Sequence, residues 1–317
     1  MSEAPGAAHQ KYERLIARAR QVAPPVVAVA HPCERGALEA AIDAARLGLI
    51  APILVGPGRE IRAIAAAAAL DIAALQIEES EHSRDSALRA VELVRAGKAE
   101  ALMKGSLHTD ELMSAVVRSD GGLRTARRLS HCFVMDVPGH DDPLIITDAA
   151  INIFPALADK IDILQNAIDL ANALGITPVR AAILSAVETV NPKIPSTIEA
   201  AALCKMSDRG QITGAIVDGP LALDNAISLG AAAIKHLSSP VAGCANVIMV
   251  PDLEAGNMLA KSLTFLAGAD AAGIVIGARV PIILTSRADS VHARLASCAV
   301  ASLIAASRRS DVHKAVA

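Results

Sequence analysis

The feature that most constrains this 317-residue chain is a repeated alternation of short apolar runs with amphipathic stretches. Residues 26–31, 52–56 and 101–105 are mainly apolar runs typical of buried strands, and 72–77 is a further predicted strand. Between them, apolar residues recur at helical spacing in the segments 34–47, 59–70 and 83–96. Strands and helices that alternate through short connections predict a parallel, doubly wound α/β sheet.

The middle of the chain departs from this alternation. Two apolar runs, 129–137 and 144–148, are separated only by Pro138–Pro143, which favours an antiparallel hairpin because parallel pairing needs a longer crossover. The alternation then restarts, with strands expected at 181–185, 215–217, 247–250 and 273–277 and helices at 159–174, 196–206 and 254–266. We predict two α/β domains, 1–147 plus 275–317 and 148–274, joined without a glycine- or serine-rich linker.

Composition narrows the class of protein. Hydrophobic residues make up 53% and charged residues 20%, which indicates a packed globular chain. One tyrosine, three phenylalanines, no tryptophan and a net charge of -3 argue against nucleic-acid binding. The five cysteines have no C-x-x-C spacing, no signal peptide is expected, and no apolar run is long enough to span a membrane. These features favour a cytoplasmic protein with no nucleic-acid or membrane partner.

The stretch Val280–Ser290 is the strongest candidate for a binding site. A buried strand there ends in Thr285-Ser286-Arg287 and leads into an amphipathic segment, 291–307. This arrangement brings a hydroxyl, a guanidinium and helix N–H groups to the carboxyl end of a strand, where α/β sheets bind ligands and where an anion is favoured. The alternative is a plain strand-to-helix turn, with Ser286 or Asp289 as N-cap and Arg287 in solvent.

Polar residues follow other predicted strands. Lys104 ends the strand at 101–105, and acids follow three more predicted strands: Asp148, Asp218 and Asp252. Each acid alone would serve as a helix or turn cap. Together with 285–287, they favour strand ends that converge on one site.

Several nucleotide, hydrolase and metal motifs are missing. The sequence contains no G-x-G-x-x-G after its first strand, no G-x-x-x-x-G-K-[ST] and no G-x-S-x-G. Its nine histidines form no H-E-x-x-H or other close ligand pair, so we expect no catalytic metal.

Five short motifs follow one another along the chain: Lys104-Gly105, Thr147-Asp148-Ala149-Ala150, Val217-Asp218-Gly219-Pro220, Pro-Asp-Leu-Glu-Ala-Gly-Asn at 251–257, and Thr285-Ser286-Arg287-Ala288-Asp289. In this order they resemble the phosphate acetyltransferases and phosphate butyryltransferases. The resemblance covers the chain from about Val26 to the C-terminus, and its most specific part is the motif at 251–257. It is closer to the butyryl branch at Thr147-Asp148 and 285–289.

The resemblance implies a fold and a reaction. It implies two doubly wound α/β domains of the isocitrate/isopropylmalate dehydrogenase type, a cleft between them, and a homodimer. It also implies reversible transfer of an acetyl or butyryl group between coenzyme A and inorganic phosphate, directly within a ternary complex. Coenzyme A is then a substrate, and no cofactor is implied. The preferred acyl chain length is not predicted, because pocket size is a tertiary property.

The resemblance also implies roles for residues. Arg287 would hold phosphate and stabilise the tetrahedral oxyanion, and Ser286 would donate a hydrogen bond to the same centre. Arg124, after Gly121-Gly122-Leu123, resembles a Leu-Arg site near coenzyme A. The implied catalytic residues are Ser286, Arg287 and Asp289, and the implied substrate-binding residues are Lys104, Arg124, Asp148, Asp218, Asp252 and Asn257.

The resemblance does not identify the base that activates the coenzyme A thiol. Acetyl-specific relatives carry an aspartate seven residues after the serine, where this chain has Ala293. We expect that Asp289 is the base or that no dedicated base exists. His292 is the alternative, because the pKa of histidine suits proton transfer near neutral pH.

Two functions other than acyl transfer are alternatives for this sequence. A metal- and NAD-dependent dehydrogenase of the isocitrate/isopropylmalate or phosphothreonine type could recruit Asp218 and Asp252, but its nucleotide loop is missing. A non-catalytic regulator would not need the intact Ser286-Arg287 pair.

Overall fold

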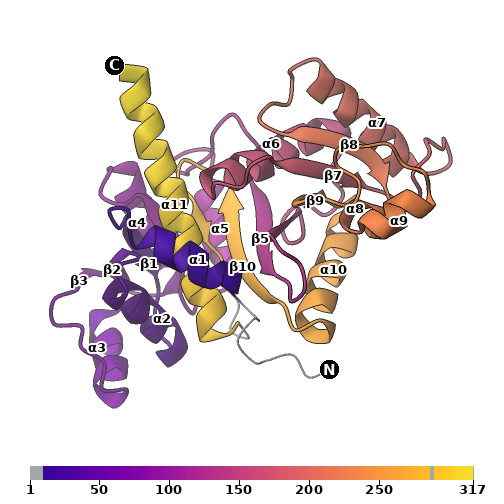
Figure 1. The fold of residues 1–317 in the computed structure, drawn as a ribbon. Helices are drawn as coiled ribbons and strands as arrows, with labels where there is room; N and C mark the ends of the chain where they lie inside the picture. The colour runs from indigo at the N-terminus through magenta and orange to yellow at the C-terminus, as the bar shows by residue number, and fades with distance from the viewer. Residues whose placement is uncertain (1–9, 286–288, 317) are drawn as a thin grey trace, which may run out of the picture. The chain divides into compact units, whose positions relative to one another are not determined.

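The chain folds into two compact units, whose elements are labelled in Figure 1. The computed structural model describes residues 10–285 and 289–316, with side chains through Ser310. The flanking unit consists of Tyr12–Arg127 and the residues from Ala272 onward, and the central unit consists of Gln10, Lys11 and Arg128–Ala271. The predicted hairpin strands belong to the central unit, because the second of them pairs there with a later strand. The chain therefore passes from the flanking unit into the central unit after Arg127, and not after residue 147.

The flanking unit is a doubly wound sheet. Strand β1 (Val26–Ala30) pairs in parallel with β2 (Ala51–Gly56) on one side and with β4 (Ala101–Lys104) on the other. The strand order therefore reverses between β1 and β4. The other strands are β3 (Gln76–Glu79), β11 (Ile282–Ile283) and most of β10 (Asp270–Ile276), and the helices are most of α1 (Gln10–Ala19), α2 (Arg35–Arg46), α3 (Gly58–Ala67), α4 (Ser83–Arg95), α5 (Thr109–Val116) and α11 (Val291–Val316).

One strand pairing of the flanking unit differs from the prediction. Strand β11 is buried and parallel to β4, as expected for the run after Val280, but it pairs antiparallel with β10. The segment 277–281 that joins β10 to β11 is too short for a parallel crossover. The sheet is therefore mixed and not purely parallel.

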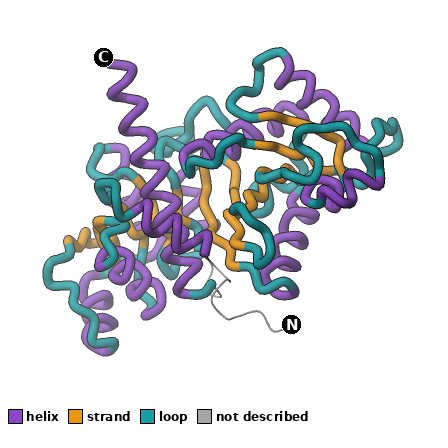
Figure 2. Tube along the Cα trace, in the orientation of Figure 1, coloured by secondary structure: helices purple, strands orange, loops and turns teal. Residues whose placement is uncertain are grey.

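The central unit contains the predicted hairpin. Strands β5 (Ser130–Asp136) and β6 (Leu144–Thr147) are antiparallel, with Cys132 opposite Thr147. The order continues through three parallel strands: β9 (Val247–Met249), β7 (Arg180–Leu184) and β8 (Ile216–Leu221). Figure 2 draws the strands of the chain in orange. The helices of the central unit are α6 (Leu157–Ala173), α7 (Pro195–Asp208), α8 (Leu223–Ile227), α9 (Leu229–Ile234) and α10 (Leu253–Leu266).

Each unit has an apolar interior that fits its sequence pattern. In the flanking unit, Leu102 and Met103 of β4 are at most 1% exposed, as expected for a strand covered on both faces. In the central unit, alternate residues of the hairpin strands, including Met135 and Ile146, join one buried cluster with Ile248 of β9. Among the described residues, no helix combines the length and the apolarity that a membrane crossing requires.

Candidate active site

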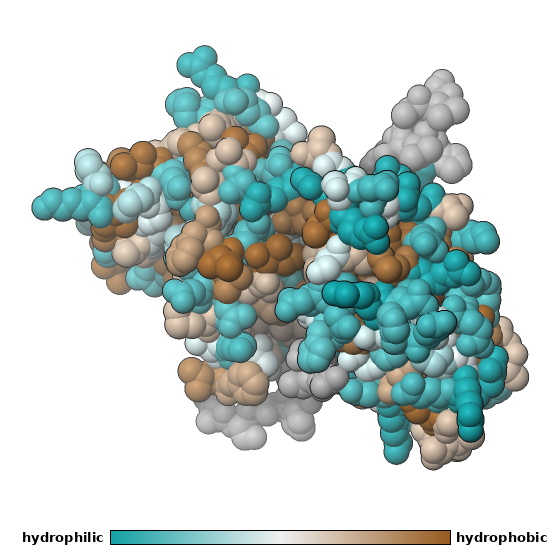
Figure 3. Space-filling view, turned by 180° about the vertical axis from the view of Figure 1, so that it is seen from behind, coloured by the Kyte–Doolittle hydropathy of each residue, from teal (hydrophilic) through white to brown (hydrophobic). Residues whose placement is uncertain are grey.

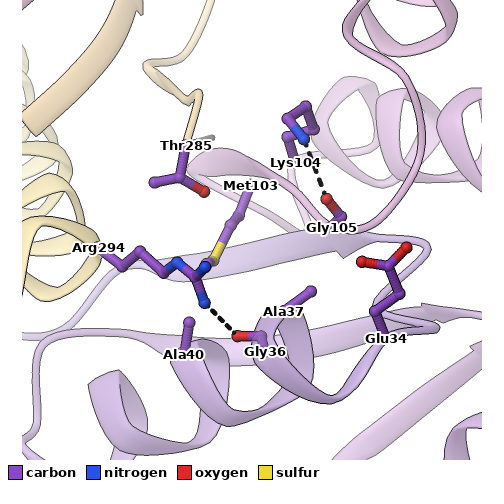
Figure 4. A pocket seen from close by; sticks show the side chains of 9 residues that line it. All are labelled: Glu34, Gly36, Ala37, Ala40, Met103, Lys104, Gly105, Thr285 and Arg294. Atoms are coloured by element: carbon purple, nitrogen blue, oxygen red, sulfur yellow. Dashed lines mark hydrogen bonds between the residues drawn. The ribbon is translucent and has the colours of Figure 1, made fainter. Parts of the chain in front are cut away.

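A pocket of about 250 Å³ lies at the carboxyl ends of β4 and β11 in the flanking unit (Figure 4). It lies beside the reversal of strand order between β1 and β4, which is where open α/β sheets bind ligands. Polar and charged side chains from four segments line it: Glu34, Lys104, Thr285 and Arg294.

Lys104 places a cation in the pocket lining. It is the last residue of β4, and its side chain is almost completely buried. Its Nζ donates hydrogen bonds to the carbonyl oxygens of Gly105, at 3.2 Å, and Leu107, at 3.4 Å. The strand-end position predicted from the sequence is therefore part of the pocket.

Gly105 explains how this strand end reaches β1. A Cβ atom at this position would lie 2.4 Å from the carbonyl oxygen of Ala30 and 2.5 Å from that of His31. Any larger residue would push the ends of β4 and β1 apart, so glycine is required for this close approach. The Gly105 amide also donates to the Ala30 carbonyl at 2.9 Å.

Thr285 and the start of α11 form another wall of the pocket. Thr285 is buried after β11 and lines the pocket, while Ser286 and Arg287 lie outside the described residues. Helix α11 is capped by Ser290, whose Oγ accepts from the Ala293 amide at 3.0 Å. Ser290 therefore supplies a capping side chain, which the sequence alternative did not name, and Asp289 lies half-buried just before it.

His292 and Arg294 face different neighbours, although both lie in the first turns of α11. The ring of His292 stacks on Tyr12 at 5.6 Å, and its Nδ1 lies 3.9 Å from the carboxylate of Glu13. Arg294 lines the pocket and donates from its guanidinium to the Gly36 carbonyl at 2.9 Å. His292 therefore faces α1, and it does not line the pocket with Arg294.

In the central unit, Asp148 organises the turn after β6. Its carboxylate is buried and accepts from the amides of Ala150, at 2.9 Å, and Ile151, at 3.1 Å. It also accepts from the amide of Asn152 at 3.3 Å and from its side-chain nitrogen at 2.5 Å. Four donors on one carboxylate hold this turn in a single conformation.

Helix α10 begins against the Asp148 turn. Asp252 is its N-cap and accepts from the Ala255 amide at 2.9 Å, as the capping alternative predicted. Asn257 donates from its side chain to the Ala149 carbonyl at 3.2 Å. The structure thus brings Asp148, Asp252 and Asn257 into one neighbourhood of the central unit.

Asp218 does not follow its strand as predicted. It lies within β8, which continues to Leu221, and its carboxylate accepts from the adjacent Gly219 amide at 2.9 Å. The sequence suggested an earlier end because proline usually interrupts a strand. Here β8 is an edge strand, where a residue without an N–H is tolerated. Strands β9 and β7 lie between β8, which carries Asp218, and β6, which precedes Asp148. The two acids are therefore not on neighbouring strands.

His131 is a buried titratable residue that the sequence did not single out. It is 2% exposed on β5, one residue before the Cys132–Thr147 pair, and its ring contacts Phe133 edge-on at 4.4 Å. Burial lowers the pKa of His131 to about 4, and the Asp148 carboxylate partly opposes this effect. The alternation of β5 could have placed it on the same face as Phe133, but not next to Asp148.

The pocket lining differs from the sequence prediction at three positions. Arg124 is exposed and forms a β-bridge with Ala278, and it is not among the described residues that line the pocket. Glu34 and Arg294 do line it, although no motif had singled them out. The reversal of strand order next to β1 would have pointed to Glu34, four residues after that strand.

Comparison with known proteins gives a consistent result. The family model described as "Phosphate acetyl/butaryl transferase" matches residues 79–302. A phosphate acetyltransferase of Rhizobium meliloti is 65% identical over 306 residues, which cover 96% of this chain and 97% of that protein. A phosphate butyryltransferase of Clostridium acetobutylicum is 41% identical over 299 residues, which cover 94% and 99%.

A solved structure agrees with the sequence relatives. The branched-chain phosphotransacylase of Enterococcus faecalis V583 superposes with a TM-score of 0.76 and 30% identity, covering 88% of this chain and 98% of that one. The chain therefore belongs to the phosphate acetyl/butyryl transferase family and is an acyltransferase. These matches support the acyltransferase interpretation over the dehydrogenase alternative.

Proposed function

We propose that this chain reversibly transfers an acetyl or butyryl group between coenzyme A and inorganic phosphate. The observation that carries the proposal is the pocket at the ends of β4 and β11, lined by Lys104, Arg294 and Thr285, the residue that precedes Ser286-Arg287 in the sequence. Two cations beside a strand-to-helix junction suit a phosphoryl group. The family relatives bear names of the same activity.

The proposed reaction is a direct displacement. A phosphate oxygen attacks the thioester carbonyl, and the carbon passes through a tetrahedral intermediate with a negative oxygen. Collapse of this intermediate breaks the carbon–sulfur bond, releases the coenzyme A thiolate and leaves an acyl phosphate. Arg287 stabilises the negative charge, and Ser286 donates a hydrogen bond to the same centre without itself being acylated.

Charge stabilisation carries most of the activation of the thiol in the reverse direction. Asp289, just before the capped start of α11, is the candidate base, while the contacts of His292 with Tyr12 and Glu13 direct that ring toward α1. The site near the pocket is positively charged, which lowers the pKa of a bound thiol directly.

Further parts of the proposal concern substrate contacts and setting. Lys104 and Arg124 contact the anionic ends of the substrates, and Asp148, Asp218, Asp252 and Asn257 complete or position the substrate-binding surface. The reaction uses no metal and no cofactor. The protein is a cytoplasmic homodimer without a membrane partner, and its architecture is of the isocitrate/isopropylmalate dehydrogenase type.

The test is acyl phosphate formation from acetyl-CoA or butyryl-CoA and phosphate, with EDTA present and without NAD. We expect turnover to persist under these conditions and coenzyme A to appear in step with acyl phosphate. A requirement for a divalent metal, or an acyl-enzyme that forms without phosphate, would contradict the proposed mechanism.

A further inference from the structure

Arg294 lines the pocket, but the proposed mechanism assigns it no contact with a substrate. Its side chain extends from the first turn of α11 toward the first turn of α2, and its guanidinium lies between Thr285 and Gly36 in the pocket lining (Figure 4). The bond to the Gly36 carbonyl, at 2.9 Å, fixes the position of the guanidinium. A planar donor group that is already held in place loses little entropy when it binds an anion.

The charges around Arg294 favour an anion. Lys104 and Arg294 give the described lining two positive charges against the single carboxylate of Glu34. Figure 4 places Glu34 and Arg294 on opposite sides of the pocket. The start of α2 adds positive partial charge, and its N-cap, Glu34, makes no side-chain capping bond to the helix.

The size of the pocket limits the ligand. At about 250 Å³, it is smaller than the pockets of about 300–1,000 Å³ that enclose drug-sized ligands. A whole coenzyme A molecule is therefore excluded from it, whereas one phosphoryl group fits. That group can belong to inorganic or acyl phosphate, or it can be one of the phosphates of coenzyme A.

We propose that Arg294 is a substrate-binding residue that, with Lys104, holds a phosphoryl group in this pocket. This inference rests on the proposed acyl transfer and assigns it one more anion contact, from α11. Arginine suits this role because its guanidinium can bind two phosphate oxygens in parallel.

The alternative role for Arg294 is purely structural, since its bond to Gly36 joins α11 to α2. The chain offers a matched control on the same helix. Arg308 also donates from its guanidinium to a backbone carbonyl, that of Arg279, at 2.8 Å, and it is not among the residues lining the pocket. If helix anchoring were the whole role, Arg294→Ala and Arg308→Ala would have similar effects.

The experiment compares wild type, Arg294→Ala, Arg294→Lys and Arg308→Ala in steady-state kinetics, with phosphate and acyl-CoA varied separately. We expect Arg294→Ala to raise one KM about 10- to 100-fold, the loss expected for a charge-assisted hydrogen bond, with a smaller change in kcat. Arg294→Lys should recover part of this loss, because it restores the charge without the planar donor group. Arg308→Ala should leave both KM values unchanged.

The substrate whose KM rises identifies the source of the phosphoryl group. A higher KM for phosphate assigns the pocket to phosphate and acyl phosphate. A higher KM for acyl-CoA assigns the pocket to a phosphate of coenzyme A. If this difference between Arg294→Ala and wild type disappears with acyl-dephospho-CoA as the substrate, the pocket binds the 3′-phosphate. If the difference persists, the pocket binds the pyrophosphate. A fall in kcat alone, or a loss of thermal stability equal to that of Arg308→Ala with unchanged KM values, would overturn the inference.

A binding measurement separates this inference from the proposed function. Inorganic phosphate and pyrophosphate should raise the melting temperature of wild type and of Arg308→Ala, but should have less effect on Arg294→Ala. If wild type shows this shift but no acyl transfer, the proposed function fails and the anion site stands. If acyl transfer occurs and Arg294→Ala retains both its kinetics and its phosphate-induced shift, the anion site fails alone.

Discussion

At the scale of single residues, two neighbours on α11 have different roles because of the surfaces they face. Arg294 lines the pocket, while His292 stacks on Tyr12 and approaches Glu13. We therefore expect His292→Ala to retain the rate of the reverse reaction, from acyl phosphate and coenzyme A, within about tenfold, since removing a true general base typically costs about 10²–10⁴-fold. The rate of Asp289→Asn should fall more than that of His292→Ala.

The measurement is the pH profile of the reverse reaction for wild type and both variants. A loss of several orders of magnitude in His292→Ala, together with loss of the acidic limb of the profile, would show that His292 is the base. Unchanged profiles in both variants would leave thiol activation to the positive charge of the site alone.

A second prediction for a single residue concerns His131, and it is about stability and not activity. Burial lowers the pKa of His131 from 6.5 to about 4 in the folded chain, against the opposing effect of Asp148. The unfolded chain therefore binds a proton at His131 below pH 6.5, while the folded chain remains neutral there until about pH 4. Unfolding takes up a proton in this window, so stability falls as the pH is lowered.

The lowered pKa of His131 therefore predicts a progressive loss of stability as the pH falls from 6.5 toward 4. His131→Gln removes the titrating group, so its free energy of unfolding should decline less steeply over this window than that of wild type, whatever its stability at pH 7. Urea unfolding at a series of pH values measures both slopes. Parallel slopes would mean that His131 titrates alike in the folded and unfolded chains.

At the scale of secondary-structure elements, helix α10 depends on a close contact with the Asp148 turn. A Cβ atom at Gly256 would lie 2.8 Å from Val250 Cγ2, 3.0 Å from the Cβ of Ala149 and 3.0 Å from the Asp148 carbonyl oxygen. Gly256→Ala should therefore destabilise the chain by about 1–3 kcal/mol through overpacking. It should also raise the KM for the substrates, because it displaces the Asp148 turn. Gly230→Ala in α9 meets only Ser228 Oγ at 3.8 Å, and should be neutral or stabilising.

Both variants add the same methyl group to a helix, so their difference in melting temperature reports the contact and not helix propensity. Thermal unfolding measures the stability of both variants, and steady-state kinetics measures their KM values. Equal melting temperatures would show that α10 can shift away from the turn at little cost.

The elements themselves were largely predictable, because their signals are local. The helix predicted at Ser83–Ala96 is observed as α4, Ser83–Arg95, and the β5–β6 hairpin follows from the short segment between its strands. Lys104 was placed correctly at a strand end for the same reason. The short helices α5, α8 and α9 were missed, since segments of five to eight residues carry little periodicity.

The sequence failed where tertiary contacts decide the outcome. The position of β11 between β4 and β10 depends on which strands lie next to it in the sheet, and the length of β8 depends on its place at the sheet edge. Arg294 lines the pocket because α11 starts beside α2, and the lowered pKa of His131 follows from its burial on β5. None of these neighbours can be read from residue spacing along the chain.

At the scale of the whole molecule, the prediction is a homodimer in solution. Helix α10 leaves apolar side chains exposed along one side, with Met258 63%, Phe265 78% and Leu266 86% exposed. Ile153 and Phe154, in the segment before α6, are also exposed. In a chain with only three phenylalanines, two largely exposed ones indicate a surface that is covered by another molecule. Figure 3 shows hydrophobic side chains, in brown, reaching the surface in that view.

Sedimentation velocity at micromolar concentration should therefore give a single species of twice the chain mass, 32.6 kDa per subunit. Phe265→Asp places a charge in the apolar surface of α10 and should shift the protein toward monomer, because an unpaired buried charge opposes association. Val117→Asp changes an exposed apolar residue of α5's C-terminus, in the flanking unit, and should leave the dimer intact. A monomeric wild type would rule out the homodimer, and a dimeric Phe265→Asp would place the interface on another surface.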